Sequence, residues 1–164
     1  MQFFVYGRDR PGSLQLKMDL TEHHWTFLDP YADRLIARGP TLDDHGDPTG
    51  SLHIVDLPDV AAARTFAYEE PYYLGGVFES VMLCRYVNLL GRAVPSDSGY
   101  LVIAGGVAPI TSKHLFAYGD LFALDGAAHA GRAALLQAPS LEAAIRSAPD
   151  DATVHPWRRG GRQP

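Results

Sequence analysis

The sequence is poor in cysteine and has no long apolar run, and both deficits exclude classes of protein. Cys84 is the single cysteine among 164 residues, which excludes an intrachain disulfide and a zinc site built from cysteines. No apolar stretch approaches the roughly 20 residues that cross a bilayer. The N-terminal segment has no basic region ahead of its apolar run, so we expect no signal peptide. A cytoplasmic protein is the resulting expectation.

Basic residues and cofactor motifs are also scarce. The 14 Lys and Arg are outnumbered by 19 Asp and Glu, for a net charge of −5, which argues against binding to nucleic acid. The one basic cluster, in residues 157–164, is short, glycine-rich and terminal, and predicts a frayed, solvated end. The sequence has no Walker A loop, no G-x-G-x-x-G after a strand and no metal-ligand spacing such as H-x-x-x-H on one helix face. We therefore expect neither a cofactor nor a metal.

Two segments of similar pattern indicate an internal repeat. Residues 50–67 and 131–148 each predict a strand, a turn containing proline and then an alanine-rich helix. Asp59 and Ser140 stand where they can accept hydrogen bonds from the first N–H groups of those helices. We divide the chain into a first half (1–90), a linker (91–99), a second half (100–157) and a tail (158–164).

Each half is predicted to run β-α-β-β-α-β, which is the ferredoxin-like order and an α+β fold. The first half has strands at about 2–7, 37–42, 50–56 and 78–86 and helices at about 14–36 and 59–69. The second half has strands at about 100–105, 119–124, 130–138 and 152–157 and helices at about 109–117 and 140–147. Because two helices on one face of a sheet leave the other face bare, we expect the halves to pack sheet to sheet as a pseudo-dimer within one chain.

Two adjacent histidines in the first helix should point in opposite directions. With a period of 3.6 residues, His24 shares an apolar stripe with Leu20 and Leu28, whereas His23 lies on the more polar side. His23 is then a surface residue. His24 is either a core histidine satisfied by one hydrogen bond or a half-buried imidazole that can move a proton. Trp25, the next residue, is expected to serve in packing.

A second candidate stretch is the corner after the second helix. Glu70 precedes Pro71, so the helix should end there, and Tyr72 follows in an aromatic, glycine-containing turn. A carboxylate at such a corner can orient an imidazole or act as a base. The alternative is a solvated acidic helix end.

The first half resembles the YCII-related domain family of the dimeric α/β-barrel superfamily. The resemblance rests on "FVYGRDRPGSL", on His24, on "RGPTLDDHGDPTGSLHIVD" and on "EEPYYLGGVFESVMLCRY", and it covers residues 1–87 in order. It implies that His24 and the acidic-Pro-Tyr motif starting at Glu70 form the site, with Asp9 from the "YGxD" motif. The family's usual aspartate is Glu70 here, and its usual arginine is Lys17.

The resemblance implies an enzyme. We expect a cofactor-independent lyase or isomerase that moves protons on a small aromatic, quinone-like or lactone substrate. His24 would be the general acid/base, and Glu70 or Asp9 would orient it or hold the complementary proton. The residues expected to line the pocket are Tyr6, Arg8, Ser51 and Tyr72. A non-catalytic small-ligand binder and a structural dimerisation module are the alternatives.

The second half is predicted to be a degenerate copy without a site. Its counterpart of His24 would be His114 on the helix at 109–117, and it has no acidic-Pro-Tyr motif. Partners other than the small molecule are not indicated, although further association into a homodimer is compatible with the pattern.

Overall fold

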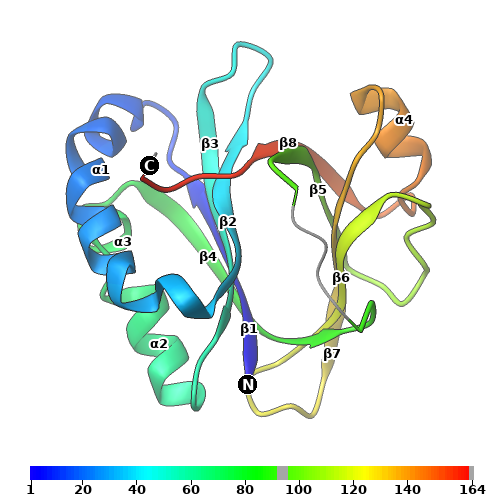
Figure 1. The fold of residues 1–164 in the computed structure, drawn as a ribbon, viewed down its shortest axis with the longest axis horizontal. Coiled ribbons are helices and arrows are strands. Elements are labelled where there is room, and N and C mark those ends of the chain that lie inside the picture. The colour runs from blue at the N-terminus through cyan, green and yellow to red at the C-terminus, as the bar shows by residue number, and fades with distance from the viewer. Residues whose placement is uncertain (92–95, 163–164) are drawn as a thin grey trace.

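A computed structural model describes residues 1–91 and 96–162. Its strands form one closed barrel in the order β1-β3-β2-β8-β5-β7-β6-β4, with the helices on the outside (Figure 1). The elements of the first half are β1 (Gln2–Asp9), α1 (Leu14–Leu28), η1 (Asp29–Arg34), β2 (Leu35–Leu42), β3 (Pro48–Asp56), α2 (Val60–Tyr68), α3 (Pro71–Leu74) and β4 (Phe78–Asn88). Those of the second half are β5 (Ser98–Ala104), β6 (Leu115–Phe122), β7 (His129–Leu136), α4 (Leu141–Arg146) and β8 (Thr153–Arg158).

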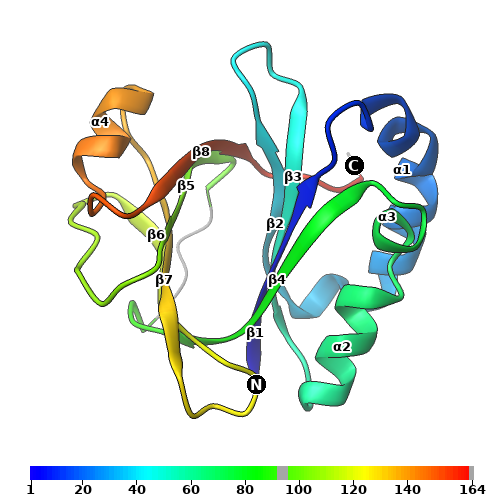
Figure 2. The ribbon, with the colours of Figure 1, turned by 180° about the vertical axis from the view of Figure 1, so that it is seen from behind.

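The two halves contribute strands in the same relative order. In the first half the order is β4-β1-β3-β2, and in the second half it is β8-β5-β7-β6. The halves meet at both edges, where β2 pairs with β8 and β4 pairs with β6. The strands of the two halves thus form one α+β barrel that closes within the chain, and β8 crosses toward the first half in Figure 2.

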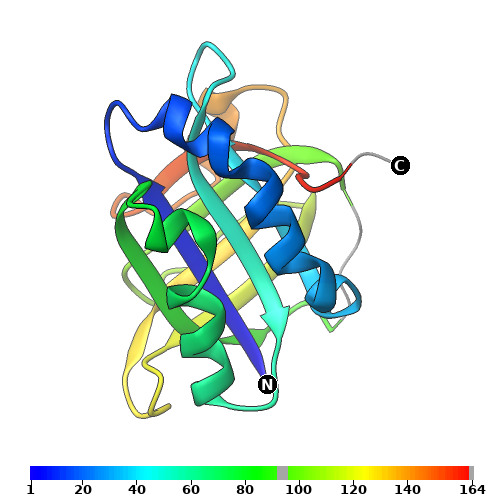
Figure 3. The ribbon, with the colours of Figure 1, turned by 90° about the vertical axis from the view of Figure 1, so that its left-hand side faces the viewer.

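The barrel interior is the largest core, because strand residues alternate between the inside and the helix-covered outside. Phe4, Leu52 and Leu135 are among the inward-facing residues. Residues one position away, such as Phe3 and Val55, face outward and pack against α1 and α2. The helices α1, α2 and α3 lie side by side over the outer face of β1, β3 and β4 (Figure 3). The candidate site thus lies on the outer face of the barrel, separate from the core inside it.

Two predicted helices are wrong. The helix predicted over 14–36 ends at Leu28, and β2 begins at Leu35 after the short η1. Pro30 stands at the start of η1 and cannot donate a backbone hydrogen bond to continue α1. The helix predicted over 109–117 does not form, because β6 begins at Leu115.

The segment 115–122 has the burial pattern of a strand. Ala117, Gly119 and Leu121 are buried at alternate positions, which is the period of a strand. His114 consequently lies in an exposed loop before β6 and is not a helical counterpart of His24. The predicted helix caps are confirmed: Asp59 accepts from the N–H of Ala62 at 2.8 Å, and Ser140 accepts from that of Ala143 at 3.1 Å.

The C-terminal tail differs from the frayed end that we predicted. Arg158 ends β8, and residues 158–162, which we call the strap, lie along β2 and α1. Residues 163–164 of the predicted tail and 92–95 of the predicted linker lie outside the described residues, and Ser98 and Gly99 of that linker already belong to β5. Among the described helices, none has the length and apolar character needed to cross a membrane.

Candidate functional site

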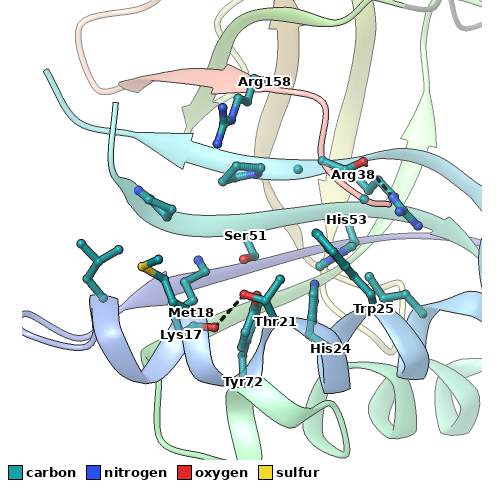
Figure 4. A pocket seen from close by; sticks show the side chains of 17 residues that line it. Lys17, Met18, Thr21, His24, Trp25, Arg38, Ser51, His53, Tyr72 and Arg158 are labelled. Atoms are coloured by element: carbon teal, nitrogen blue, oxygen red, sulfur yellow. Dashed lines mark hydrogen bonds between the residues drawn. The ribbon is translucent and has the colours of Figure 1, made fainter. Parts of the chain in front are cut away.

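A pocket of about 180 Å³ lies outside the barrel, between α1 and the strands β2 and β3 (Figure 4). Side chains of α1 and Tyr72 of α3 form one wall, and residues of β2, β3 and the strap form the other. The lining residues are Leu14, Lys17, Met18, Thr21, His24, Trp25, Leu28, Arg38, Gly39, Pro40, Pro48, Ser51, His53, Tyr72, Arg158, Gly160 and Gly161.

His24 and Glu70 form a buried dyad at this pocket. The Nδ1 atom of His24 lies 2.7 Å from Oε2 of Glu70, and the two side chains are 7% and 6% exposed. Of the two carboxylates expected beside His24, Glu70 is thus the one that lies within hydrogen-bond distance. His24 points inward and His23 is exposed, as the helical period predicts.

Glu70 is held in place by the helix that it starts. As the N-cap of α3, it accepts a hydrogen bond from the N–H of Tyr73 to Oε1 at 3.0 Å, and Pro71 occupies the first turn. One carboxylate oxygen is therefore used by the backbone and the other faces the imidazole. The solvated helix end that we considered for Glu70 is excluded, because the residue is 5% exposed.

Aromatic rings fix the orientation of His24. Its ring stacks on that of Tyr72, with centroids 4.0 Å apart and planes 16° apart, and it lies 5.5 Å from the ring of His53. The hydroxyl of Tyr72 in turn donates to Oγ1 of Thr21 at 3.2 Å. These contacts from three elements leave the imidazole with little rotational freedom.

Asp9 is part of a second buried pair rather than a partner of His24. Nζ of Lys17 lies 2.8 Å and 3.0 Å from the two carboxylate oxygens of Asp9 and donates to the carbonyl of Gly50 at 3.1 Å. Both side chains are less than a tenth exposed. Asp9 therefore anchors Lys17 beside the pocket, and of the two carboxylates it is Glu70 that contacts the imidazole.

Burial determines the protonation of the dyad. Burial, together with the nearby cations Lys17 and Arg38, lowers the pKa of His24 to about 3. A neighbouring carboxylate raises the pKa of an imidazole in a solvated site, but His24 is buried and the effect of burial is the larger one. Burial also lowers the pKa of His53 to about 3 and raises that of the Glu70 carboxyl above its usual value.

The dyad therefore has a neutral imidazole near neutral pH. With its proton on Nδ1, His24 donates to the Glu70 carboxylate, and its Nε2 lone pair remains available to a molecule in the pocket. Burial raises the pKa of Tyr72 to about 12, so its hydroxyl stays protonated and serves as a donor. The arrangement can take a proton from a bound molecule and return it.

The predicted pocket residues divide into two groups. Ser51 and Tyr72 line the pocket. Tyr6 does not, because it alternates into the barrel interior and hydrogen-bonds to Oγ1 of Thr41 at 3.1 Å. Arg8 does not either: its side chain is 69% exposed and pairs with Glu79 at 2.9 Å.

Several lining residues were not predicted. His53 follows Ser51 by two positions on β3, so both side chains reach the same outer face, and this period-two spacing was a usable signal. Arg38 and the strap residues had no such signal, because they reach the pocket through pairings between distant segments. In the described ranges, no group of three or more His, Cys, Asp or Glu is placed to hold a metal ion.

Comparison with known proteins agrees with the first-half geometry. The model of the YCII-related domain family matches residues 1–86. The chain belongs to this family. Protein YciI of Escherichia coli is 32% identical over 89 residues, which cover 49% of this chain and 91% of YciI. An uncharacterised protein of Haemophilus influenzae is 28% identical over 91 residues, covering 51% of this chain and 93% of that protein.

A solved structure is similar over the same part of the chain. It is 5-chloro-2-hydroxyhydroquinone dehydrochlorinase (TftG) of Burkholderia phenoliruptrix in complex with 2,5-dihydroxybenzoquinone. The identity is 32% and the TM-score 0.50, with 53% of this chain and 94% of TftG covered. A small-molecule, lyase-like enzyme is the activity class that this neighbour supports.

Proposed function

We propose that this protein is a lyase that moves a proton on a small quinone-like or hydroxylated aromatic ring, with His24 as the general acid/base. The observation that carries the proposal is the 2.7 Å contact between His24 and Glu70 at the wall of the pocket. An isomerase, which would return the proton to another atom of the same ring, would use the same dyad.

The proposed step needs only proton transfer by residues of this chain. Nε2 of His24 takes a proton from the bound ring, and the electron pair left behind expels a leaving group from a neighbouring carbon. The resulting imidazolium is stabilised by Glu70, as the carboxylate does in other His–carboxylate pairs. The proton then leaves with the solvent or product. Ser51, which lines the pocket, would donate a hydrogen bond from its hydroxyl to an oxygen of the ring, and Tyr72 would pack against the ring.

We also propose that the second half is a degenerate repeat of the first, so that the barrel is a pseudo-dimer of two ferredoxin-like units. The matching strand order supports this proposal. Among the described residues of the second half, α4 is the single α-helix, and the region has no acidic-Pro-Tyr corner. The chemistry would then depend on the first half alone.

The test compares His24→Ala with His23→Ala in an assay of chloride release from 5-chloro-2-hydroxyhydroquinone. His24→Ala should lower turnover about 10²–10⁴-fold with the fold intact by circular dichroism, because an acid/base residue contributes about that much. His23→Ala is the matched control, since it removes an exposed imidazole from the adjacent position.

Glu70→Gln tests the role of the carboxylate in orienting His24 without changing the packing at residue 70. Glutamine keeps the shape and the cap to Tyr73, but its amide N–H₂ would face Nδ1 and favour the wrong tautomer of His24. Turnover should fall at least about tenfold. Equal and small losses in His24→Ala and His23→Ala would instead favour a non-catalytic binder.

A further inference from the structure

The pocket is completed by a part of the chain that the family match does not include. Arg158, Gly160 and Gly161 of the strap line the pocket, whereas the family model ends at residue 86. The matched part of YciI already accounts for 91% of that protein. The strap therefore lies outside the part of the chain that the family model matches.

The strap is attached firmly to both walls. The N–H of Gly160 donates to the carbonyl of Arg38, and Nε of Arg38 donates to the carbonyl of Gly160, both at 3.0 Å. At the end of the strap, the guanidinium of Arg162 lies 2.7 Å from Glu22 and 3.1 Å from Asp29, and its carbon is 5.7 Å from the ring centroid of Trp25. These contacts join the strap to β2 on one side and to α1 on the other.

Two of the cations that line the pocket, Arg38 and Arg158, are not engaged by a carboxylate of the described residues. Lys17 also lines it, but Asp9 neutralises that side chain, and none of the 17 lining residues is itself Asp or Glu. Within the described part of the chain, no carboxylate lies within 4.0 Å of the guanidinium of Arg158 or Arg38, whereas Arg162 is neutralised by its two partners. Figure 4 places Arg158 across the pocket from the α1 side chains. A ligand with negative charge would be attracted to this site.

We propose that Arg158 is a specificity-determining residue of the pocket and that it binds an anionic oxygen of a single-ring ligand, such as an ionised hydroxyquinone. This inference rests on the proposed function and names the charge state of its substrate. Guanidinium groups suit such oxygens because they donate two parallel hydrogen bonds. The cavity has a suitable size, since an apolar cavity of about 150 Å³ holds one benzene ring.

An anionic ligand would also raise the pKa of His24. A negative charge beside a neutral imidazole favours its protonated form, so the bound ligand itself would make Nε2 a better proton acceptor. The strap would thus select the ligand whose charge assists the dyad.

The test measures binding of 2,5-dihydroxybenzoquinone, whose acidic hydroxyl groups make it an anion at neutral pH. We expect Arg158→Gln to raise the Kd about tenfold, because a hydrogen bond between charged groups is lost. Arg158→Lys, which keeps the charge, should raise it less than about threefold. Arg159→Gln is the matched control: it removes the same charge one residue further on, from a side chain that pairs with Asp97 and does not line the pocket.

Salt provides a second readout. The affinity of the wild-type chain should fall between about 0.05 M and 0.5 M salt, and that of Arg158→Gln should fall less, because screening acts on the interaction that the variant lacks. Equal Kd values for Arg158→Gln and Arg159→Gln, an affinity independent of salt, or no binding by the wild-type chain at millimolar probe would each overturn the inference. Binding through Arg158 together with unchanged turnover in His24→Ala would leave the inference standing and remove the proposed function.

Discussion

His24 and His53 lie with their ring centroids 5.5 Å apart beneath α1, and each residue is 6% exposed. Two imidazoles so close and so buried cannot both carry a proton at low cost, because each charge would be desolvated and would repel the other. His24 has Glu70 as a partner for its Nδ1 proton, whereas His53 contacts the aromatic rings of His24 and Phe66. The pair therefore has one imidazole suited to proton transfer and one held neutral.

Neutral burial of His53 makes folding stability depend on pH. Because its pKa is about 3 in the folded chain and about 6.5 in the unfolded chain, the unfolded state binds the extra proton between these values, and stability falls as the pH drops from 7 toward 3. At pH 5 the loss from this residue is about 2 kcal/mol. His53→Gln should therefore lose about 2 kcal/mol less than the wild type between pH 7 and pH 5 in urea denaturation. His23→Gln is the control, and an unchanged pH slope in His53→Gln would contradict the prediction.

The helix α1 carries most of the pocket wall, yet it has weak local signals for its own start. Ser13 makes no side-chain cap, and the first turn has no acidic residue. The buried pair of Lys17 and Asp9 instead joins the first turns of α1 to the end of β1, and Lys17 also reaches Gly50 on β3. Tertiary contacts thus position the helix that carries His24.

Removing one partner of the Lys17–Asp9 pair should lower the free energy of unfolding more than removing both charges. Lys17→Met leaves the carboxylate of Asp9 buried without a cation and should cost about 3 kcal/mol or more in the free energy of unfolding. The double variant Lys17→Met with Asp9→Asn should recover at least about 1 kcal/mol of that loss, because no uncompensated charge remains. Urea denaturation of the single and double variants measures both values, and strictly additive losses would show that the two charges do not depend on each other.

The whole barrel depends on a seam where the first half meets the second. At β2–β8 the described register is the single pair Thr41 and Trp157, and the strap continues the contact beyond it. Gly39 allows this close approach: its φ is 150°, and a Cβ there would lie 2.0 Å from the carbonyl oxygen of Arg158. A side chain at this position must therefore push the seam apart.

Gly39→Ala should consequently destabilise the protein by about 2–3 kcal/mol, through backbone strain and the clash with Arg158 together. Gly46→Ala is a matched control, because Gly46 also has a positive φ of 84° but has nothing within 4 Å of the added methyl group. We expect that variant to cost about 1 kcal/mol. Thermal unfolding of the two variants compares the values, and equal losses would mean that the close approach of the strap to β2 adds nothing to stability.

Local patterns in the sequence predicted the parts of this protein that depend on near neighbours. The helical period directs His24 inward and His23 outward, and Asp59 and Ser140 cap the helices that follow them. Pro71 explains why a helix ends before Glu70, although the short helix α3 that begins at Pro71 was not predicted. The motifs of residues 1–87 were sufficient to identify the YCII-related domain family. Each of these features is set within one element or across one turn, where residue type and spacing act directly.

The remaining features depend on contacts between distant segments. Asp9 and Glu70 were both candidates to contact His24, and in the folded chain Asp9 pairs with Lys17 whereas Glu70 pairs with His24. Tyr6 does not line the pocket because its side chain lies on the face of β1 that points into the barrel. Residues 115–117 form a strand rather than a helix because β6 pairs with β7 and β4. Closure of the barrel brings the strap, more than 100 residues away along the chain, onto the pocket of His24. Such pairings follow from burial and register in three dimensions, which the spacing of residues along a sequence does not contain.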